Sequence, residues 1–317
     1  MPALRSLLAS FFLLNAAAFG ADPGLLSLVM PDAKVIAGIQ VDQARISPFG
    51  QYVLTHMQPD DENFKKFMSD TGFDPRRDLR EIVMASNSGT DITSHWVVIA
   101  RGMFDASKFA AAVKQNDGTV TSFQGVDLLS GGAPSAGGTD SVVAFPDNST
   151  AVMGDPDSVK TTIQRFQTKA SGANLATQVK NLSASYDFWF LTLVPLSEFA
   201  AIMPDPNMGQ AMKGNLFQAI SQASGGLKFG ANVQFQMQAV ARSEQDAKSL
   251  ADVVRFIAGL IQTNKGKGPA AGQVSTLVDS MHLSTSGNVM TMSLSVPETQ
   301  VEQLLMSAHP KKQTASK

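Results

Sequence analysis

The chain has 317 residues, of which 44% are hydrophobic and only 16% charged, and its formal net charge is −2. This balance excludes a disordered protein, because disorder requires a low apolar content and a high net charge. The absence of cysteine excludes disulfide-stapled miniproteins, zinc–thiolate sites, iron–sulfur proteins and cysteine hydrolases. The net charge near zero also argues against nucleic acid as a partner, since that binding depends on excess positive charge. We expect a globular chain with a large core and with no cofactor or metal.

Residues 1–20 show the three-part pattern of an export signal. Arg5 gives the positively charged start, residues 7–14 are mostly apolar, and small residues then offer a cleavage site. A cut after Gly20 fits best, and a cut after Ala18 competes with it. The apolar run is shorter than the roughly 20 residues needed to cross a bilayer, so we predict no transmembrane span after signal removal. An exported chain without cysteine fits a bacterial envelope, and we expect it in the periplasm or outside the cell.

The same order of predicted elements occurs twice, which indicates an internal repeat. In the first half, residue periodicity and turn residues predict strands at 35–41, 80–85, 95–101, 121–129, 141–145 and 150–153, with helical segments at 45–70, 106–115 and 156–168. In the second half they predict strands at 186–194, 227–235 and 236–242 and a hairpin at 280–296, with helical segments at 196–223, 244–263 and 298–307. The stretch 227–242 is also compatible with one long strand.

Alternation of apolar and polar residues indicates the kind of sheet. Residues 233–239 alternate apolar side chains with glutamines, and residues 290–296 alternate apolar side chains with threonine and serine. This pattern is typical of antiparallel strands with one buried and one solvated face. The helix at 244–263 carries a wide apolar stripe that would pack on the buried face. We therefore predict an α+β fold of two similar halves, each a mainly antiparallel sheet with amphipathic helices packed on one face.

These patterns divide the chain into five parts. We expect a signal peptide at 1–20, a first α+β repeat at 21–170, a linker at 171–185, a second α+β repeat at 186–308 and a disordered tail at 309–317.

Familiar catalytic motifs are absent from the sequence. It contains four histidines, at positions His56, His95, His282 and His309. None lies within five residues of another, so no HExxH zinc helix is present, and no GxSxG nucleophile elbow occurs. Asp155 and Asp157 precede an apolar helical pattern, where capping of the helix explains them. The glycine-rich stretch 131–138 lacks the Lys-Ser/Thr that follows in a phosphate-binding loop.

A non-enzymatic role fits this pattern, namely an exported scaffold or binding protein of the bacterial envelope. Its partner would be an unknown envelope protein or an apolar ligand. Two alternatives are a hydrolase whose site is assembled from distant residues and a carrier of a lipid or other apolar ligand. The candidates for a ligand surface are three methionines near the last hairpin and two histidines, namely Met281, Met290, Met292, His95 and His282. Simple core packing also explains the hairpin methionines, because they follow the strand alternation.

Overall fold

The computed structural model describes residues 20–56, 62–89, 95–131, 141–171, 175–202, 209–210, 212–263 and 276–308. Of the predicted export signal, only Gly20 falls within these ranges. The predicted tail at 309–317 and most of the glycine-rich stretch at 131–138 lie outside them. No helix within the described ranges is both long and apolar enough to cross a membrane.

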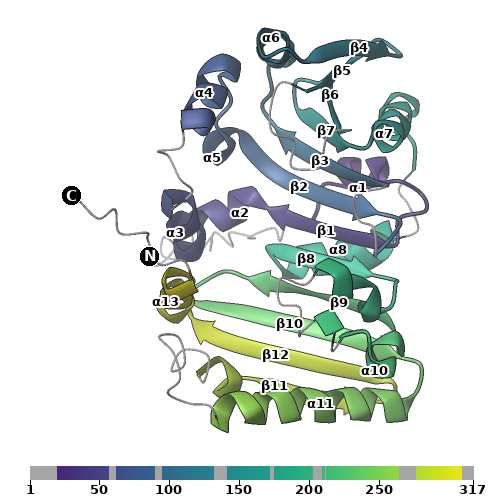
Figure 1. Cartoon of the computed structure of the whole chain (residues 1–317), viewed down its shortest axis with the longest axis vertical. Helices are drawn as coiled ribbons and strands as arrows, with labels where there is room; N and C mark the ends of the chain where they lie inside the picture. The colour runs from purple at the N-terminus through teal and green to yellow at the C-terminus, as the bar shows by residue number, and fades with distance from the viewer. Residues whose placement is uncertain are drawn as a thin grey trace, which may run out of the picture.

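One large antiparallel sheet forms the centre of the fold (Figure 1). Within the described residues, twelve strands pair in the order β11-β12-β10-β9-β8-β1-β2-β3-β7-β6-β5-β4. The first seven are β1 (Val35–Gln40), β2 (Leu79–Ser86), β3 (Trp96–Gly102), β4 (Thr119–Phe123), β5 (Val126–Ser130), β6 (Val142–Asp147) and β7 (Thr150–Gly154). The other five are β8 (Phe188–Thr192), β9 (Ile220–Lys228), β10 (Asn232–Ala241), β11 (His282–Ser286) and β12 (Val289–Pro297). The predicted α+β class with a mainly antiparallel sheet is confirmed.

Helices connect the strands and pack on the sheet. In the N-terminal part they are α1 (Pro23–Leu28), α2 (Val41–Ile46), α3 (Pro48–His56), α4 (Glu62–Thr71), α5 (Pro75–Asp78), α6 (Ala106–Gln115) and α7 (Pro156–Thr168). They continue with α8 (Ala176–Ser185), the 3₁₀-helix η1 (Leu196–Ile202), α10 (Asn215–Gln218), α11 (Glu244–Thr263) and α13 (Glu298–Ala308). Asp105 and Asp155 accept hydrogen bonds from the first backbone N–H groups of α6 and α7, so capping fixes where these helices begin.

Four predictions differ from the structure. The strands expected at 227–235 and 236–242, or as one strand over 227–242, are instead the end of β9 and the whole of β10, with residues 229–231 between them. The single strand at 121–129 is instead the β4–β5 hairpin, whose two-residue turn places Gln124 and Gly125 at φ values of 49° and 81°. Positive φ at both positions is typical of a type I′ hairpin turn. The helical material expected up to residue 223 ends earlier, because β9 begins at Ile220 and pairs with both β8 and β10. The segment 171–185, expected to be a linker, contains α8, which contacts β8 and β9.

In the N-terminal part, helices cover both faces of the sheet. One core cluster joins α1, α7 and α8 to the strands and includes Leu128, and a second joins α4 and α6 and includes Leu129. Adjacent residues of a strand point to opposite faces, and these two leucines of β5 are 5% and 4% exposed. The prediction that helices pack on one face is therefore wrong for this part. The reason is that apolar runs such as 96–99 place side chains on both faces, as in strands covered on two sides.

In the C-terminal part, the two faces of strands β10 to β12 differ in polarity. Ile220, Ala239 and Met290 form a third core cluster with Leu250 of α11. The helix α11 contacts β10, β11 and β12. The opposite face carries polar side chains in register across the strands, namely Gln234, Gln236, Gln238, Thr291, Ser293, Ser295, His282, Ser284 and Ser286. The predicted alternation of a dry and a solvated face is confirmed for these strands.

Strands β1 and β8 join the two parts of the sheet. Gly38 of β1 lies opposite Trp189 of β8, and a Cβ atom on Gly38 would lie 2.4 Å from Cζ2 of Trp189. Trp189 is completely buried. Because glycine has no Cβ, the indole of Trp189 can pack directly against the backbone of Gly38 at the centre of the sheet.

Candidate functional site

The methionines singled out from the sequence lie on or beside the last hairpin. Met290 is completely buried in the cluster under α11, and Met292 packs against the same cluster. Met281 is partly buried just before β11. Met290 and Met292 thus contribute to the core between the sheet and α11.

The two candidate histidines lie far apart on the sheet. His95 is exposed just before β3, and His282 is exposed at the start of β11 on the polar face. Six strands separate β3 from β11 in the sheet order. The fold does not bring these two imidazoles together.

An open pocket of about 400 Å³ lies where α4, α5 and α6 meet the end of β3. Segments distant in the sequence form its wall, namely residues 71–73, 77 and 78, residues 103–105 and 108, and Asn148 in the turn between β6 and β7. This pocket combines an aromatic base with charged side chains at its mouth, and we take it as the candidate functional site.

The base of the pocket is a packed aromatic cluster. The rings of Phe73 and Phe104 stack with their centroids 5.3 Å apart and an interplanar angle of 28°. Phe109 and Phe145 extend the cluster, with their ring centroids 4.6 Å apart. Such rings offer a rigid apolar surface, because little rotamer freedom remains in a packed aromatic cluster.

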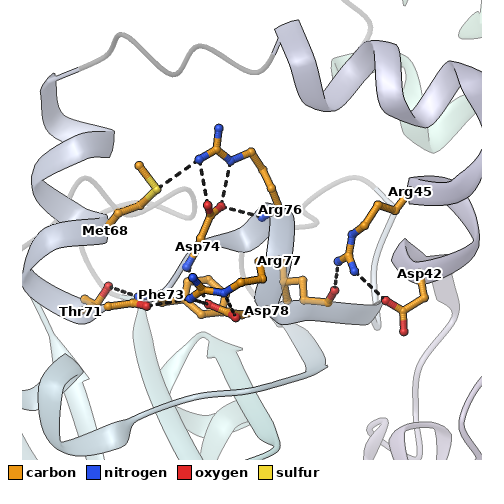
Figure 2. Close-up of polar contacts among 11 residues, drawn as sticks. Asp42, Arg45, Met68, Thr71, Phe73, Asp74, Arg76, Arg77 and Asp78 are labelled. Carbon is orange, nitrogen blue, oxygen red and sulfur yellow. Dashed lines mark hydrogen bonds and ion pairs between the residues drawn. The ribbon is translucent and has the colours of Figure 1, made fainter.

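The sequence Asp74-Pro75-Arg76-Arg77-Asp78 forms the tight turn beside the pocket (Figure 2). Asp74 Oδ1 accepts a hydrogen bond from the Arg76 backbone N–H at 3.0 Å and so caps α5. The Arg76 guanidinium donates to both Asp74 oxygens, at 2.9 and 2.8 Å. These hydrogen bonds hold the pKa of Asp74 below its usual value of 3.8. Arg76 is therefore used in fixing the turn.

Asp78 is the buried carboxylate of the site. Its Oδ2 accepts a hydrogen bond from the Asp74 backbone N–H at 2.8 Å, and Arg77 donates to both Asp78 oxygens at 2.7 Å. The Arg77 guanidinium holds the pKa of Asp78 below its usual range. The side chain of Asp78 is 4% exposed and that of Arg77 is 65% exposed. The acid thus lies beneath the arginine, which faces solvent at the mouth of the pocket.

Arg77 and Lys108 both reach Gly72. Arg77 Nη2 donates to the Gly72 carbonyl oxygen at 3.2 Å, and Lys108 Nζ lies 3.3 Å from the position that a Cβ of Gly72 would occupy. Gly72 has a φ of +70°, a left-handed conformation that favours glycine. Lys108 Nζ is 3.7 Å from Asp105 Oδ2, which is too long for a hydrogen bond. Two cationic groups therefore lie beside Gly72, close to the aromatic base.

The three carboxylates beside this pocket all have a pKa below the ordinary value of an aspartate. The Ser107 hydroxyl lowers the pKa of Asp105, and arginine contacts lower those of Asp74 and Asp78. Such carboxylates stay ionised near neutral pH and are poor proton donors or acceptors there. In the part of the chain that the structure describes, no group of three or more His, Cys, Asp or Glu side chains is placed to hold a metal ion.

No motif in the sequence indicates this pocket. The paired acids and arginines of 74–78 are a local signal for a polar turn. The contributions of Phe104, Lys108 and Asn148 depend on the fold, since these residues lie 26 or more positions beyond the turn.

No protein-family model matches the chain, and no curated protein matches it. A solved structure described as "Structure of crystal form I of TP0453" superposes on it with a TM-score of 0.47 and 9% sequence identity. The superposition covers 91% of this chain and 98% of the other.

Proposed function

We propose that the protein is an exported binding protein whose pocket takes a small ligand with an apolar ring and an anionic group. The position of Arg77 and Lys108 beside Gly72, next to the stacked rings of Phe73 and Phe104, carries this proposal. The cations offer charge-assisted hydrogen bonds to an anion, and the aromatic base offers apolar contact to a ring.

Both cations keep donors for such a ligand. The contacts between Arg77 and described residues use Nε and Nη2, which leaves Nη1 at the 65% exposed end of the side chain. Lys108 is 59% exposed, and its contact with Asp105 is a long ion pair. An anion can therefore be bound without breaking the contact between Arg77 and the buried Asp78.

The proposal of export rests on the pattern of residues 1–20. It is supported by the position of the first described residues, since Ala21 and Leu25 are buried in the core cluster under α1. A chain cut after Gly20 would keep both of these contacts.

We also propose that the two parts of the sheet derive from one repeated unit. The strand order supports this, because it runs outward from the junction as β1-β2-β3-β7-β6 on one side and β8-β9-β10-β12-β11 on the other. In addition, α6 follows β3 as α11 follows β10, and α7 follows β7 as α13 follows β12. The N-terminal part adds the β4–β5 hairpin. An experimental structure in which these five strands fail to superpose would contradict this proposal.

Benzoate is the probe for the pocket, with benzamide and acetate as compounds that lack the charge or the ring. In an NMR titration, benzoate should shift the amide signals of Gly72, Arg77, Phe104 and Lys108 at lower concentration than either comparison compound. Lys108→Gln should weaken benzoate binding about tenfold, because one charge-assisted hydrogen bond contributes about 1.5 kcal/mol.

Lys114→Gln is the matched control, because Lys114 is an exposed lysine on the same helix and does not line the pocket. Its affinity for benzoate should equal that of the unaltered protein. Equal affinity for benzoate and benzamide, or equal weakening by the two lysine substitutions, would contradict the proposed ligand class.

A further inference from the structure

A second pocket, of about 210 Å³, lies between α1 and α7, on the face of the sheet opposite the first pocket. Its wall contains three cationic side chains, Arg101 of β3 and Arg165 and Lys169 at the end of α7. Gly24 and Ser27 of α1 and Phe166 complete most of the remaining wall, and none of the described residues that line it is acidic.

We propose that this second pocket binds a tetrahedral oxyanion, such as the phosphate group of a small phosphorylated compound or of a lipid headgroup. The proposal concerns a separate surface and does not depend on the ligand of the first pocket. Its basis is the convergence of three cations, of which only one is paired with a carboxylate among the described residues.

Arg101 is the paired cation and has a fixed position. Its Nε and Nη2 donate to Asp22 Oδ2 at 2.9 and 2.7 Å, and its Nη1 donates to Thr150 Oγ1 at 2.6 Å. Gly24 packs closely against it, since a Cβ on Gly24 would lie 3.1 Å from Arg101 Nη2. The close approach of the α1 backbone thus places the guanidinium at the edge of the pocket.

Arg165 is also fixed, but by carbonyl groups. Its Nε and Nη2 donate to the Ser27 carbonyl oxygen at 2.9 and 2.7 Å, and Nη2 donates to the Ser171 carbonyl oxygen at 2.7 Å. Carbonyl oxygens orient a guanidinium without neutralising its charge. Neither Arg165 nor the exposed Lys169 forms an ion pair with a described residue.

The charge balance at this pocket remains positive. Among the described residues, Asp22 is the one carboxylate paired with these three cations, and it contacts Arg101; Glu81 lies opposite Arg101 on the neighbouring strand. Burial raises the pKa of Glu81 to about 7, so its negative charge is only partly developed at neutral pH. A bound oxyanion would supply the missing negative charge.

The size of the pocket suits a small anion. Its volume of about 210 Å³ corresponds to roughly seven water molecules at about 30 Å³ each. This space accommodates a phosphate group with a short substituent, while Phe166 gives one side of the pocket an apolar surface.

The test is a titration with inorganic phosphate, followed by NMR of the arginine Nε–H signals. Phosphate should shift the signals of Arg101 and Arg165, and Lys169→Gln should raise the dissociation constant about tenfold. Lys160→Gln is the matched control, because Lys160 lies on the same helix, outside the pocket wall and paired with Asp157. That control should bind phosphate as the unaltered protein does.

Two further arms distinguish the sources of the phosphate group. Tighter binding of glycerol phosphate than of inorganic phosphate, without sedimentation on vesicles, would support a soluble phosphorylated compound. Cosedimentation with phosphatidylcholine vesicles only when they contain phosphatidic acid, and its loss in Lys169→Gln, would support a lipid headgroup. Absence of phosphate-induced shifts at Arg101 and Arg165, or equal weakening by the two lysine substitutions, would overturn the proposal. Arg165→Lys keeps the charge but not the two-pronged geometry, and unchanged binding in this variant would also overturn it.

Discussion

The backbone N–H of Asp22 donates to both carboxylate oxygens of Glu81, at 3.1 Å each. This contact ties the chain just before α1 to β2, and Arg101 completes it from β3 by holding the Asp22 carboxylate. Glu81 is only 6% exposed. Burial is the main cause that raises its pKa to about 7.

The protonation of Glu81 should make folding stability decrease as pH rises. Because its pKa is about 7 in the folded chain and 4.5 ordinarily, the folded state binds the proton more tightly. This contribution is fully present below pH 4.5 and is lost as pH rises through 7, and it amounts to as much as about 3 kcal/mol. Glu81→Gln resembles the protonated acid and should remove this dependence in urea unfolding across that pH range.

Glu62→Gln is the control for this measurement, because Glu62 is an exposed acid in the first turn of α4. It should retain the decrease in stability with pH. An unchanged pH dependence in Glu81→Gln would show that another group causes the decrease.

Asp78 should have the opposite pH dependence. Arg77 lowers its pKa in the folded state below the ordinary 3.8, so its stabilising contribution is present above pH 3.8 and is lost as pH falls through the lower value. Asp78→Asn should lower stability at neutral pH, since the ion pair with Arg77 is lost. In this variant the unfolding free energy should also decrease less as the pH falls into the acidic range. A decrease as steep as in the unaltered protein would contradict this role of Asp78.

Two glycine-to-alanine substitutions should have opposite effects on stability. Gly38→Ala would place a Cβ 2.4 Å from Cζ2 of the buried Trp189, and such overpacking costs roughly 1–3 kcal/mol or more. Gly259→Ala in α11 meets no atom within 4 Å and should stabilise the helix by about 0.5–1 kcal/mol. Denaturant unfolding followed by tryptophan fluorescence measures both changes. Unchanged stability in Gly38→Ala would contradict the close packing at the β1–β8 junction. A loss of stability in Gly259→Ala would contradict the open space at that position of α11.

Neighbouring residues of a strand should respond differently in the two parts of the sheet. Leu128→Ala and Leu129→Ala should each cost about 2–5 kcal/mol, because both faces of β5 are buried. Met290→Ala should cost a similar amount, whereas Thr291→Ala should stay within about 0.5 kcal/mol. Thermal unfolding of the four variants compares them directly. A large loss for Thr291→Ala would contradict a solvated polar face on β12.

Elements that a local signal decides can be predicted from the sequence. The start of α7 followed from the capping residue Asp155 and from the apolar pattern behind it. The polar face of β10 and β12 followed from strict alternation.

Features that depend on contacts between distant segments cannot be predicted from the sequence in this way. The pair Leu128-Leu129 is ambiguous in sequence, because a short apolar run does not reveal whether one face or two are covered. The β4–β5 turn lacked the usual Asn-Gly signature, having Gln124 before its glycine. Both pockets require side chains from three or more separate segments. No spacing in the sequence indicates that these segments lie side by side in the fold.

The ladder between β1 and β8 has a consequence for fragments of this protein. A chain divided between residues 171 and 187 would leave β1 on one piece and β8 on the other, each with a row of unpaired backbone groups. Trp189 would lose the strand that covers it. The two pieces should therefore reassociate when mixed and regain the ladder, so the protein offers a natural split point for a complementation reporter.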